Sequence, residues 1–311
     1  MVSRMAGTLG LVMAVVSIAA CGGTRDAVEP EMPSVPKAQI VFVRDPDIYT
    51  GNDDEIHVVD SDGTSLRLLA TNATHPAVSP DGRRIAFVRS QSIWVMRRDG
   101  ANARRLTSGG EDTTPAWSAN GDHIYFSRFS RRADFSYAAA LYRVHADGRG
   151  MQQLTSPEPW DHGTCHSDPA PSPDGKVIAF VELDDCDHGF DAEIDAIDPR
   201  GGDTSLDGLA DIGSASDPAW SPDGQALAFS AVDEWGGSTG IRLARIGDTR
   251  AHVLVARPAS DPSWAPDGDW IAFVMEDTWD LWLVRSNGTS RHRLMRSATA
   301  ESSPVWLPPP R

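Results

Sequence analysis

A short phrase recurs along the chain and constrains its fold more than any other feature. It consists of one residue, a proline, a small residue, often a tryptophan, and then a turn close to Ser-Pro-Asp-Gly. Periods of this length are typical of propeller blades or helical arrays. The prolines of the phrase are separated by 39 to 54 residues and are Pro76, Pro115, Pro169, Pro218, Pro262 and Pro304.

Three short apolar runs follow each full copy of the phrase. The first run reads Ile-Ala-Phe-Val or a close variant, as at Ile85, Ile178 and Ile271. An Asp-Gly or Asn-Gly pair often precedes the third run. Runs of four or five β-branched and aromatic residues bounded by such turns predict strands joined by hairpins, and helical spacing is absent. The sequence therefore predicts an all-β fold in which each period is one four-stranded antiparallel blade.

The two ends of the repeat region complement each other. Runs at 40–43, 56–59 and 66–69 have no phrase before them, and the last copy, at 303–306, has no runs after it. We therefore predict a six-bladed β-propeller over residues 38–307, in which the C-terminal strand completes blade one and leaves no open edge. Blade four diverges, because Pro171 replaces the tryptophan and its fourth strand, near 202–209, is weakly marked.

These repeats resemble those of the TolB-type, WD-repeat-like β-propeller family. The resemblance covers about residues 38–307 and rests on five Ser-Pro-Asp-Gly-like turns in phase. It implies a propeller fold. TolB carries an α/β domain before its propeller, whereas a short tether precedes residue 38 here, so roles that depend on that domain are not implied.

The first residues have the pattern of a lipoprotein signal peptide. A basic start and an apolar stretch end in Ile-Ala-Ala-Cys21, and a Pro-rich polar segment follows. We predict that residues 1–20 are removed, that Cys21 is lipidated, and that 21–37 form a flexible tether. The protein is then exported and membrane-anchored on the periplasmic or cell-surface side, and Gly22 favours the outer membrane if the cell is Gram-negative. The alternative is an ordinary signal peptide with a chance cysteine.

The charge of the chain excludes one class of partner. It has 44 acidic residues against 28 basic ones and a net charge of −16. Nucleic acids and anionic membrane surfaces are therefore poor partners, and the membrane is reached only through the lipid anchor.

The propeller is expected to end at residue 307, and residues 308–311 are a short tail.

More than half of the acidic residues lie in the loops expected on one face of the propeller. Residues before the repeat prolines should surround the channel mouth on this face. We predict an acidic surface that binds an envelope protein, a basic peptide or a glycan, although acidic loops also serve solubility alone. Tryptophans in these loops are candidate anchors. The predicted partner-binding residues are His75, Asp168, Asp217, Asp261, Trp160, Trp235 and Trp279.

Two cysteines remain once Cys21 is lipidated. Cys165 and Cys186 lie in loops on the same face of blade four, and an exported chain matures in an oxidising compartment, so we predict a disulfide between them. Two alternatives stay open. One is a metal site, because His162, His166, Asp187 and His188 flank the cysteines, and the other is a pair of free thiols.

Signals for an enzyme are weak. The Gly-Gly-Ser-Thr-Gly segment at 236–240 matches a hydrolase motif but falls in a loop between strands. The aspartates of the Pro-Asp-Gly turns are explained by the turns without a metal. We predict a non-catalytic monomeric binding module with no cofactor and no metal. The alternative is a propeller hydrolase or lyase that uses channel carboxylates, with or without a divalent metal.

Overall fold

The structure is a computed structural model that describes residues 35–45, 53–131, 137–156, 164–184, 186, 192–206, 208–209, 212–233 and 237–309. Contacts divide the chain into two units, Met1–Ser34 and Val35–Arg311, and every described residue belongs to the second. Strands are the main regular elements of this part, which contains no helix. No helix long and apolar enough to cross a membrane occurs among the residues described.

Four sheets have four strands each, in the orders β23-β1-β2-β3, β4-β5-β6-β7, β15-β16-β17-β18 and β19-β20-β21-β22. Within each sheet, neighbouring strands are antiparallel. Their bounds are β1 Gln39–Asp45, β2 Glu55–Asp60, β3 Arg67–Thr71, β4 Thr74–Val78, β5 Arg84–Arg89, β6 Ser92–Arg97, β7 Arg104–Arg105, β15 Ala215–Trp220, β16 Ala226–Val232, β17 Ser238–Arg245, β18 His252–Val255, β19 Ala259–Trp264, β20 Trp270–Met275, β21 Asp280–Arg285, β22 His292–Arg293 and β23 Ala300–Leu307.

The other strands form one larger sheet in the order β14-β13-β12-β10-β9-β8, with β11 beside β10. A single parallel pair, Ala139 with Cys165, joins its two halves. The prediction of separate four-stranded sheets is therefore wrong here, and β14 has no outer strand among the described residues beyond an isolated bridge of Ile197 with Asp203. The bounds are β8 Glu111–Trp117, β9 His123–Arg131, β10 Tyr137–His145, β11 Gln152–Gln153, β12 Cys165–Pro171, β13 Ile178–Leu183 and β14 Ala192–Ile197.

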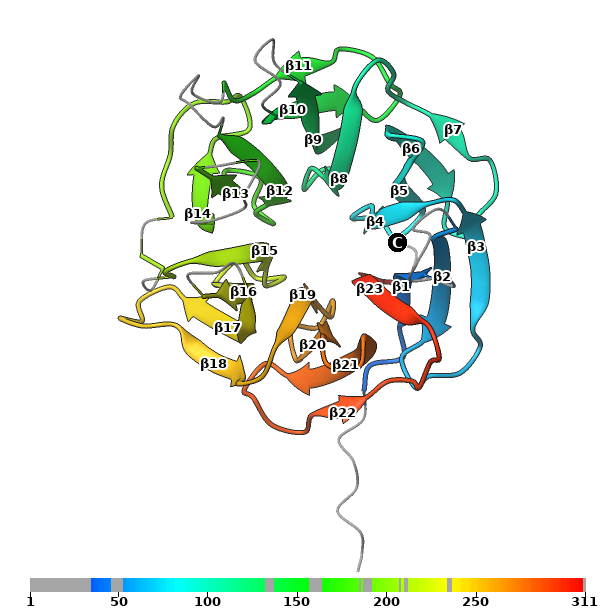
Figure 1. Cartoon of the computed structure of the whole chain (residues 1–311), viewed down its shortest axis with the longest axis vertical. Coiled ribbons are helices and arrows are strands. Elements are labelled where there is room, and N and C mark those ends of the chain that lie inside the picture. The colour runs from blue at the N-terminus through cyan, green and yellow to red at the C-terminus, as the bar shows by residue number, and fades with distance from the viewer. Residues whose placement is uncertain are drawn as a thin grey trace, which may run out of the picture. The chain divides into compact units, whose positions relative to one another are not determined.

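The sheets follow one another around a ring with the repeat-phrase strands innermost (Figure 1). Because each sheet in this ring is covered on both faces by its neighbours, the central residues of its second strand are buried and mostly apolar. Ile271, Ala272 and Phe273 of β20, for example, are at most 1% exposed. The core thus lies between adjacent sheets, as expected for a β-propeller.

Closure of the ring follows the prediction. β23 pairs antiparallel with β1, from Gln39–Leu307 to Asp45–Ala300. The last strand of the chain is therefore the innermost strand of the first sheet.

The repeat tryptophans join neighbouring sheets. Each indole Nε1 donates a 3.0 Å hydrogen bond to a backbone oxygen of the preceding innermost strand: Trp117 to Ala77, Trp220 to Ala170, Trp264 to Ala219 and Trp306 to Ser263. Val78 and Pro171 stand at this position in the other two innermost strands and have no indole N–H to donate.

The Pro-Asp-Gly aspartates act within their turns, as predicted. Ser79 Oγ donates to Asp81 Oδ1 at 2.6 Å, and the Arg83 N–H donates to the same oxygen at 3.1 Å. Gly82 has a φ of +66°, and a Cβ there would lie 2.7 Å from the Pro308 oxygen, so only glycine fits.

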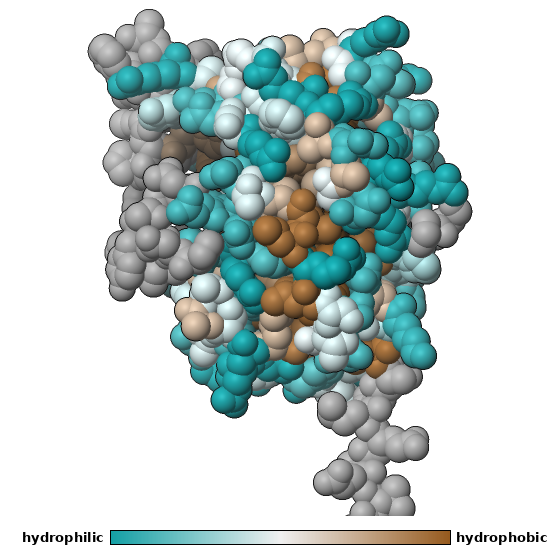
Figure 2. Space-filling model, turned by 90° about the vertical axis from the view of Figure 1, so that its right-hand side faces the viewer, coloured by the Kyte–Doolittle hydropathy of each residue, from teal (hydrophilic) through white to brown (hydrophobic). Residues whose placement is uncertain are grey.

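The outer rim is mostly hydrophilic but not uniformly so. Figure 2 faces the side of the ring that carries β3 and shows apolar side chains gathered among hydrophilic ones. Leu66 and Leu68, at the start of β3, are 40% and 50% exposed.

Candidate functional site

The innermost strands enclose a central channel with a cavity of about 450 Å³. In every innermost strand, the residue before the repeat proline is among those that line it. This set, which we call the mouth residues, is His75, Thr114, Asp168, Asp217, Asp261 and Ser303.

The backbone at the mouth residues explains their common placement. All six have a left-handed φ, between 44° and 53°, and each lies at a shift in strand register, as at Ser216/Ala219. Such a φ is uncommon for residues other than glycine, and its repetition marks a bulge built into every innermost strand. The proline that follows lacks an N–H and so tolerates the interrupted ladder. The same bend therefore brings six side chains to one channel.

Hydrogen bonds tie the three mouth carboxylates, Asp168, Asp217 and Asp261, to neighbouring groups. Asp217 Oδ2 accepts from Ser230 Oγ at 2.6 Å and from the Asp261 N–H at 3.4 Å. Asp261 Oδ2 accepts from the Ser303 N–H at 2.8 Å. Asp217 and Asp261 are thus held in place across neighbouring strands, while Asp168 Oδ2 accepts from Ser167 Oγ of its own strand at 2.8 Å.

The mouth carboxylates also interact electrostatically. Burial, and then the charge of Asp217, raise the pKa of Asp168 to about 6. The same two causes raise the pKa of Asp261 to about 7. Burial lowers the pKa of His75, against the opposing effect of Asp217, so its imidazole is neutral at pH 7. No lysine or arginine is among the described residues that line the cavity, so the mouth is an acidic site without a cation of its own.

The structure brings together four of the seven predicted partner-binding residues: His75, Asp168, Asp217 and Asp261. Trp279 is not among the lining residues. It is 50% exposed, and its backbone oxygen accepts from the Glu301 N–H at 2.8 Å. Cys21, Trp160 and Trp235 lie outside the described residues. Thr114 and Ser303 were not singled out as site residues, although they occupy the same position of the repeat phrase.

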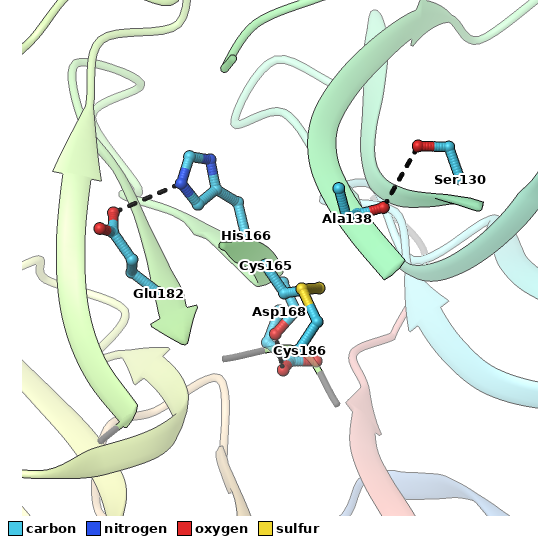
Figure 3. The surroundings of a disulfide bond; sticks show 8 residues. Ser130, Ala138, Cys165, His166, Asp168, Glu182 and Cys186 are labelled. Atoms are coloured by element: carbon cyan, nitrogen blue, oxygen red, sulfur yellow. Dashed lines mark hydrogen bonds and ion pairs between the residues drawn. A yellow bond between two sulfur atoms is a disulfide. The ribbon is translucent and has the colours of Figure 1, made fainter. Parts of the chain in front are cut away.

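The predicted disulfide is present, with 5.3 Å between the Cα atoms of Cys165 and Cys186. Figure 3 shows it together with Asp168, which lies three residues after Cys165 on β12. Of the residues proposed for an alternative metal site, His166 instead approaches Glu182, with 3.4 Å between Nε2 and Oε2. His162, Asp187 and His188 lie outside the described residues. Within the described ranges, no three His, Cys, Asp or Glu side chains are grouped to hold a metal ion.

Two buried carboxylates that connect neighbouring sheets were not predicted. Asp112 on β8 is fully buried and accepts from Arg128 Nε at 2.5 Å and Nη2 at 2.9 Å, and also from the Thr107 hydroxyl. Glu301 on β23 is likewise fully buried and accepts from Arg44 Nη2 at 3.1 Å and from the Leu281 N–H at 3.1 Å. In the sequence both resemble ordinary loop acids, and only their burial distinguishes them.

Comparison with known proteins agrees with the propeller. Residues 49–125 match the model of the dipeptidyl peptidase IV N-terminal region. A TolB homolog of Chlorobium luteolum is 30% identical over 41% of this chain and 28% of its own length. An uncharacterized peptidase, YuxL, of Bacillus subtilis is 27% identical over 39% of this chain and 24% of its own length. The matches thus span only about a quarter of these curated relatives.

The crystal structure of TolB from Acinetobacter baumannii superposes with a TM-score of 0.71, at 18% identity, over 88% of this chain and 67% of that one. At this identity the likeness concerns the fold. The chain has a TolB-like β-propeller fold, as its repeats indicated.

Proposed function

We propose that this chain is a non-catalytic binding protein of the cell envelope, anchored through a lipid on Cys21 and tethered by residues 21–37. We count residues 38–307 as six blades. The larger sheet then supplies two of them, β8–β11 and β12–β14, because a single residue pair joins its halves. Export and removal of residues 1–20 belong to the same proposal.

One observation carries the binding role: the three mouth carboxylates share a channel whose described lining holds no lysine or arginine. A cationic group that enters the mouth would meet carboxylates already held by hydrogen bonds, so little ordering is needed on binding. It would also offset the two effects, burial first and then the charge of Asp217, that raise the pKa values of Asp168 and Asp261. We infer that the partner presents a lysine, an arginine or a terminal amine, as a basic peptide or a basic segment of an envelope protein does, in preference to a neutral glycan.

A hydrolase or lyase that uses the same carboxylates is the second candidate. The raised pKa of Asp261, at about 7, is what favours it, since a general acid or base works best with a pKa near the operating pH. The matches to peptidase relatives point the same way. Turnover of peptides or oligosaccharides that is lost in Asp261→Asn would replace the binding proposal with this one.

Charge reversal at the mouth tests the proposal. For the double variant Asp217→Lys/Asp261→Lys, we expect binding of a flexible Gly/Ser peptide that carries lysines to weaken by about tenfold or more, because attraction becomes repulsion. Asp217→Asn/Asp261→Asn removes the charge with little change of shape and should weaken binding less. Isothermal titration at low and high salt measures both. Exposed Glu111, at the start of β8, provides the matched control Glu111→Lys. If the binding affinity changes neither with the mouth variants nor with salt, the proposal is wrong, and the acidic face serves solubility alone.

The pH dependence should have opposite signs for binding and for folding. Raising the pH from about 5 to 8 ionises Asp168 and Asp261, whose pKa values are about 6 and 7, so a cationic peptide should bind more tightly. Folding stability should fall over the same range. Both groups have an ordinary pKa of 3.8, so the native state holds protons that the unfolded chain has already released. Thermal unfolding of Asp261→Asn should depend less on pH. Parallel trends for binding and stability would contradict this.

A further inference from the structure

We propose that the channel receives the first residue of a partner peptide, with its terminal ammonium group at the mouth carboxylates and its apolar side chain in the channel below them. The inference rests on the proposed function and deepens it, because it selects one kind of cation among those that the mouth accepts. The observation that carries it is a change of chemistry along the channel, from charged and polar at the mouth to apolar further in.

Each innermost strand runs from its mouth residue inwards along the channel. In β15, for example, the strand continues from Asp217 through Ala219 to Trp220, and a turn follows. Later positions in the strand therefore lie deeper. The residue two positions after the mouth residue is half-buried in every innermost strand, whereas the proline between the two is buried. Five of these deeper residues line the cavity: Ala77, Ala116, Ala219, Ser263 and Val305.

We call the part of the channel below the mouth residues the lumen. Its described lining consists of prolines, alanines, valines and tryptophans, with Ser263 as the exception. The indole N–H groups of Trp117, Trp220 and Trp264 already donate to backbone oxygens, so they are not available to a polar ligand. An apolar group that displaces water from the lumen would therefore bind favourably.

The size of the cavity suits a ligand of a few heavy atoms at the tip of a larger partner. Its volume of about 450 Å³ lies within the range of about 300–1,000 Å³ that is typical of small-ligand pockets. Such pockets combine an apolar lining with a few polar groups at fixed positions, which fix the orientation of the ligand. Here the polar groups are at the entrance and the apolar lining is below.

The mouth itself has an acidic half and a neutral half. Around the ring in Figure 1, the innermost strands follow one another in the order β23, β4, β8, β12, β15 and β19. The carboxylates belong to the last three strands, and the first three carry Ser303, His75 and Thr114. A terminal ammonium group has N–H donors for several carboxylates, and the carbonyl oxygen beside it can accept from a hydroxyl of the neutral half. A free amino acid is a poorer ligand, since the acidic half repels its carboxylate.

The position of the ammonium group relative to the apolar atoms separates a terminal amine from a lysine. In a lysine side chain the ammonium group lies at the far end, so it would enter first and place no apolar atom beyond the carboxylates. At a peptide N-terminus the ammonium group and the side chain share one carbon atom. The ammonium group then stays at the mouth while the side chain reaches the layer of Ala219, which two strand residues place at most about 7 Å deeper. An apolar first residue thus contacts both the carboxylates and the lumen.

A series of small probes tests the assignment by isothermal titration. The reference is Leu-Gly-Ser-Gly with a free N-terminus and an amidated C-terminus. Acetylating its N-terminus removes the charge, and replacing its leucine by glycine removes the apolar side chain, so each change should weaken binding by about tenfold or more. The compound 3-methylbutylamine keeps the ammonium group and the carbon branch of leucine but lacks the carbonyl, and should bind more weakly than the reference peptide.

Variants of the protein test the lumen separately from the mouth. Ala219→Leu narrows the lumen without a change of charge and should weaken binding of the leucine peptide by about tenfold. Binding of acetyl-Gly-Ser-Lys-Ser-Gly amide should not change, because its lysine does not enter the lumen. Ala77→Leu on β4, across the ring from β15, is a second variant, and Ala101→Leu in an exposed turn is the matched control. Thermal unfolding of each variant checks that the fold is retained.

The inference is overturned if the leucine peptide binds no more tightly than its glycine form, its acetylated form or 3-methylbutylamine. Equal binding of the leucine peptide by Ala219→Leu, Ala77→Leu and the unchanged protein would also overturn it. The proposed function survives these results when the lysine peptide binds and Asp217→Lys/Asp261→Lys weakens that binding. If neither peptide binds, or if this double variant changes the binding of neither, then the proposed function is wrong and the inference fails with it.

Discussion

A protein that lacks Ser302–Arg311 should lose cooperative unfolding. The deletion removes most of β23, including Trp306 and Leu307, which are 3% and 1% exposed. Burial of such side chains contributes roughly 1.5–3 kcal/mol each, against a total stability of about 5–15 kcal/mol for a typical domain. The deletion also removes the hydrogen bond from the Trp306 indole to Ser263 and exposes the edge of β1. Circular dichroism against temperature measures the loss.

Two controls separate ring closure from general destabilisation. Trp306→Ala alone should cost about 3–5 kcal/mol but keep a cooperative transition. A synthetic peptide of residues 300–309 should restore the transition of the truncated protein, because it can pair with β1. Melting of the truncated protein like the full chain would mean that β23 contributes little to the ring.

Most of the fold could be predicted because each copy of the repeat forms the same buried strand and the same turn. Each Ile-Ala-Phe-Val run is buried on both faces, and each Pro-Asp-Gly turn closes a hairpin in the same way. The prediction failed in the fourth repeat, where no outer strand lies beside β14 among the described residues. Pro171 replaces the tryptophan there, but Val78 replaces it in a regular four-stranded sheet, so the lost indole hydrogen bond does not by itself account for the difference. The Ala139–Cys165 pair that links two sheets depends on three-dimensional placement and leaves no sequence pattern.

The candidate site was predictable in position but not in chemistry. The place of Asp168, Asp217 and Asp261 before the repeat prolines identified them as mouth residues. Their mutual effect on pKa depends on how close the strands bring them, which spacing in the sequence does not reveal. Thr114 and Ser303 occupy the same position of the repeat, but their neutral side chains give no charge pattern that would mark them as site residues.

The second large effect is expected at the buried ion pair of Asp112 and Arg128. Asp112→Ala should destabilise the protein by about 3–5 kcal/mol, because it leaves the Arg128 guanidinium buried without its carboxylate. The Arg128 side chain is only 13% exposed, so water replaces the lost partner poorly. The Thr107 hydroxyl, which accepts from the Ile93 N–H at 2.9 Å, loses its own acceptor at the same time. Urea unfolding followed by tryptophan fluorescence gives the change in free energy.

The double variant Asp112→Leu/Arg128→Met distinguishes the cost of an unpaired charge from a net contribution of the pair. Replacing a buried ion pair by apolar side chains of similar size is often close to neutral, so most of the stability should return. Asp277→Ala is a matched control, because it breaks an exposed ion pair between Asp277, whose side chain is 41% exposed, and Arg257, whose side chain is 58% exposed. It should change stability by no more than about 1 kcal/mol. Equal effects of Asp112→Ala and Asp277→Ala would mean that water reaches Arg128. The link between the sheets of β6 and β8 would then rest on apolar packing such as that of Val95 against Trp117 and Phe126.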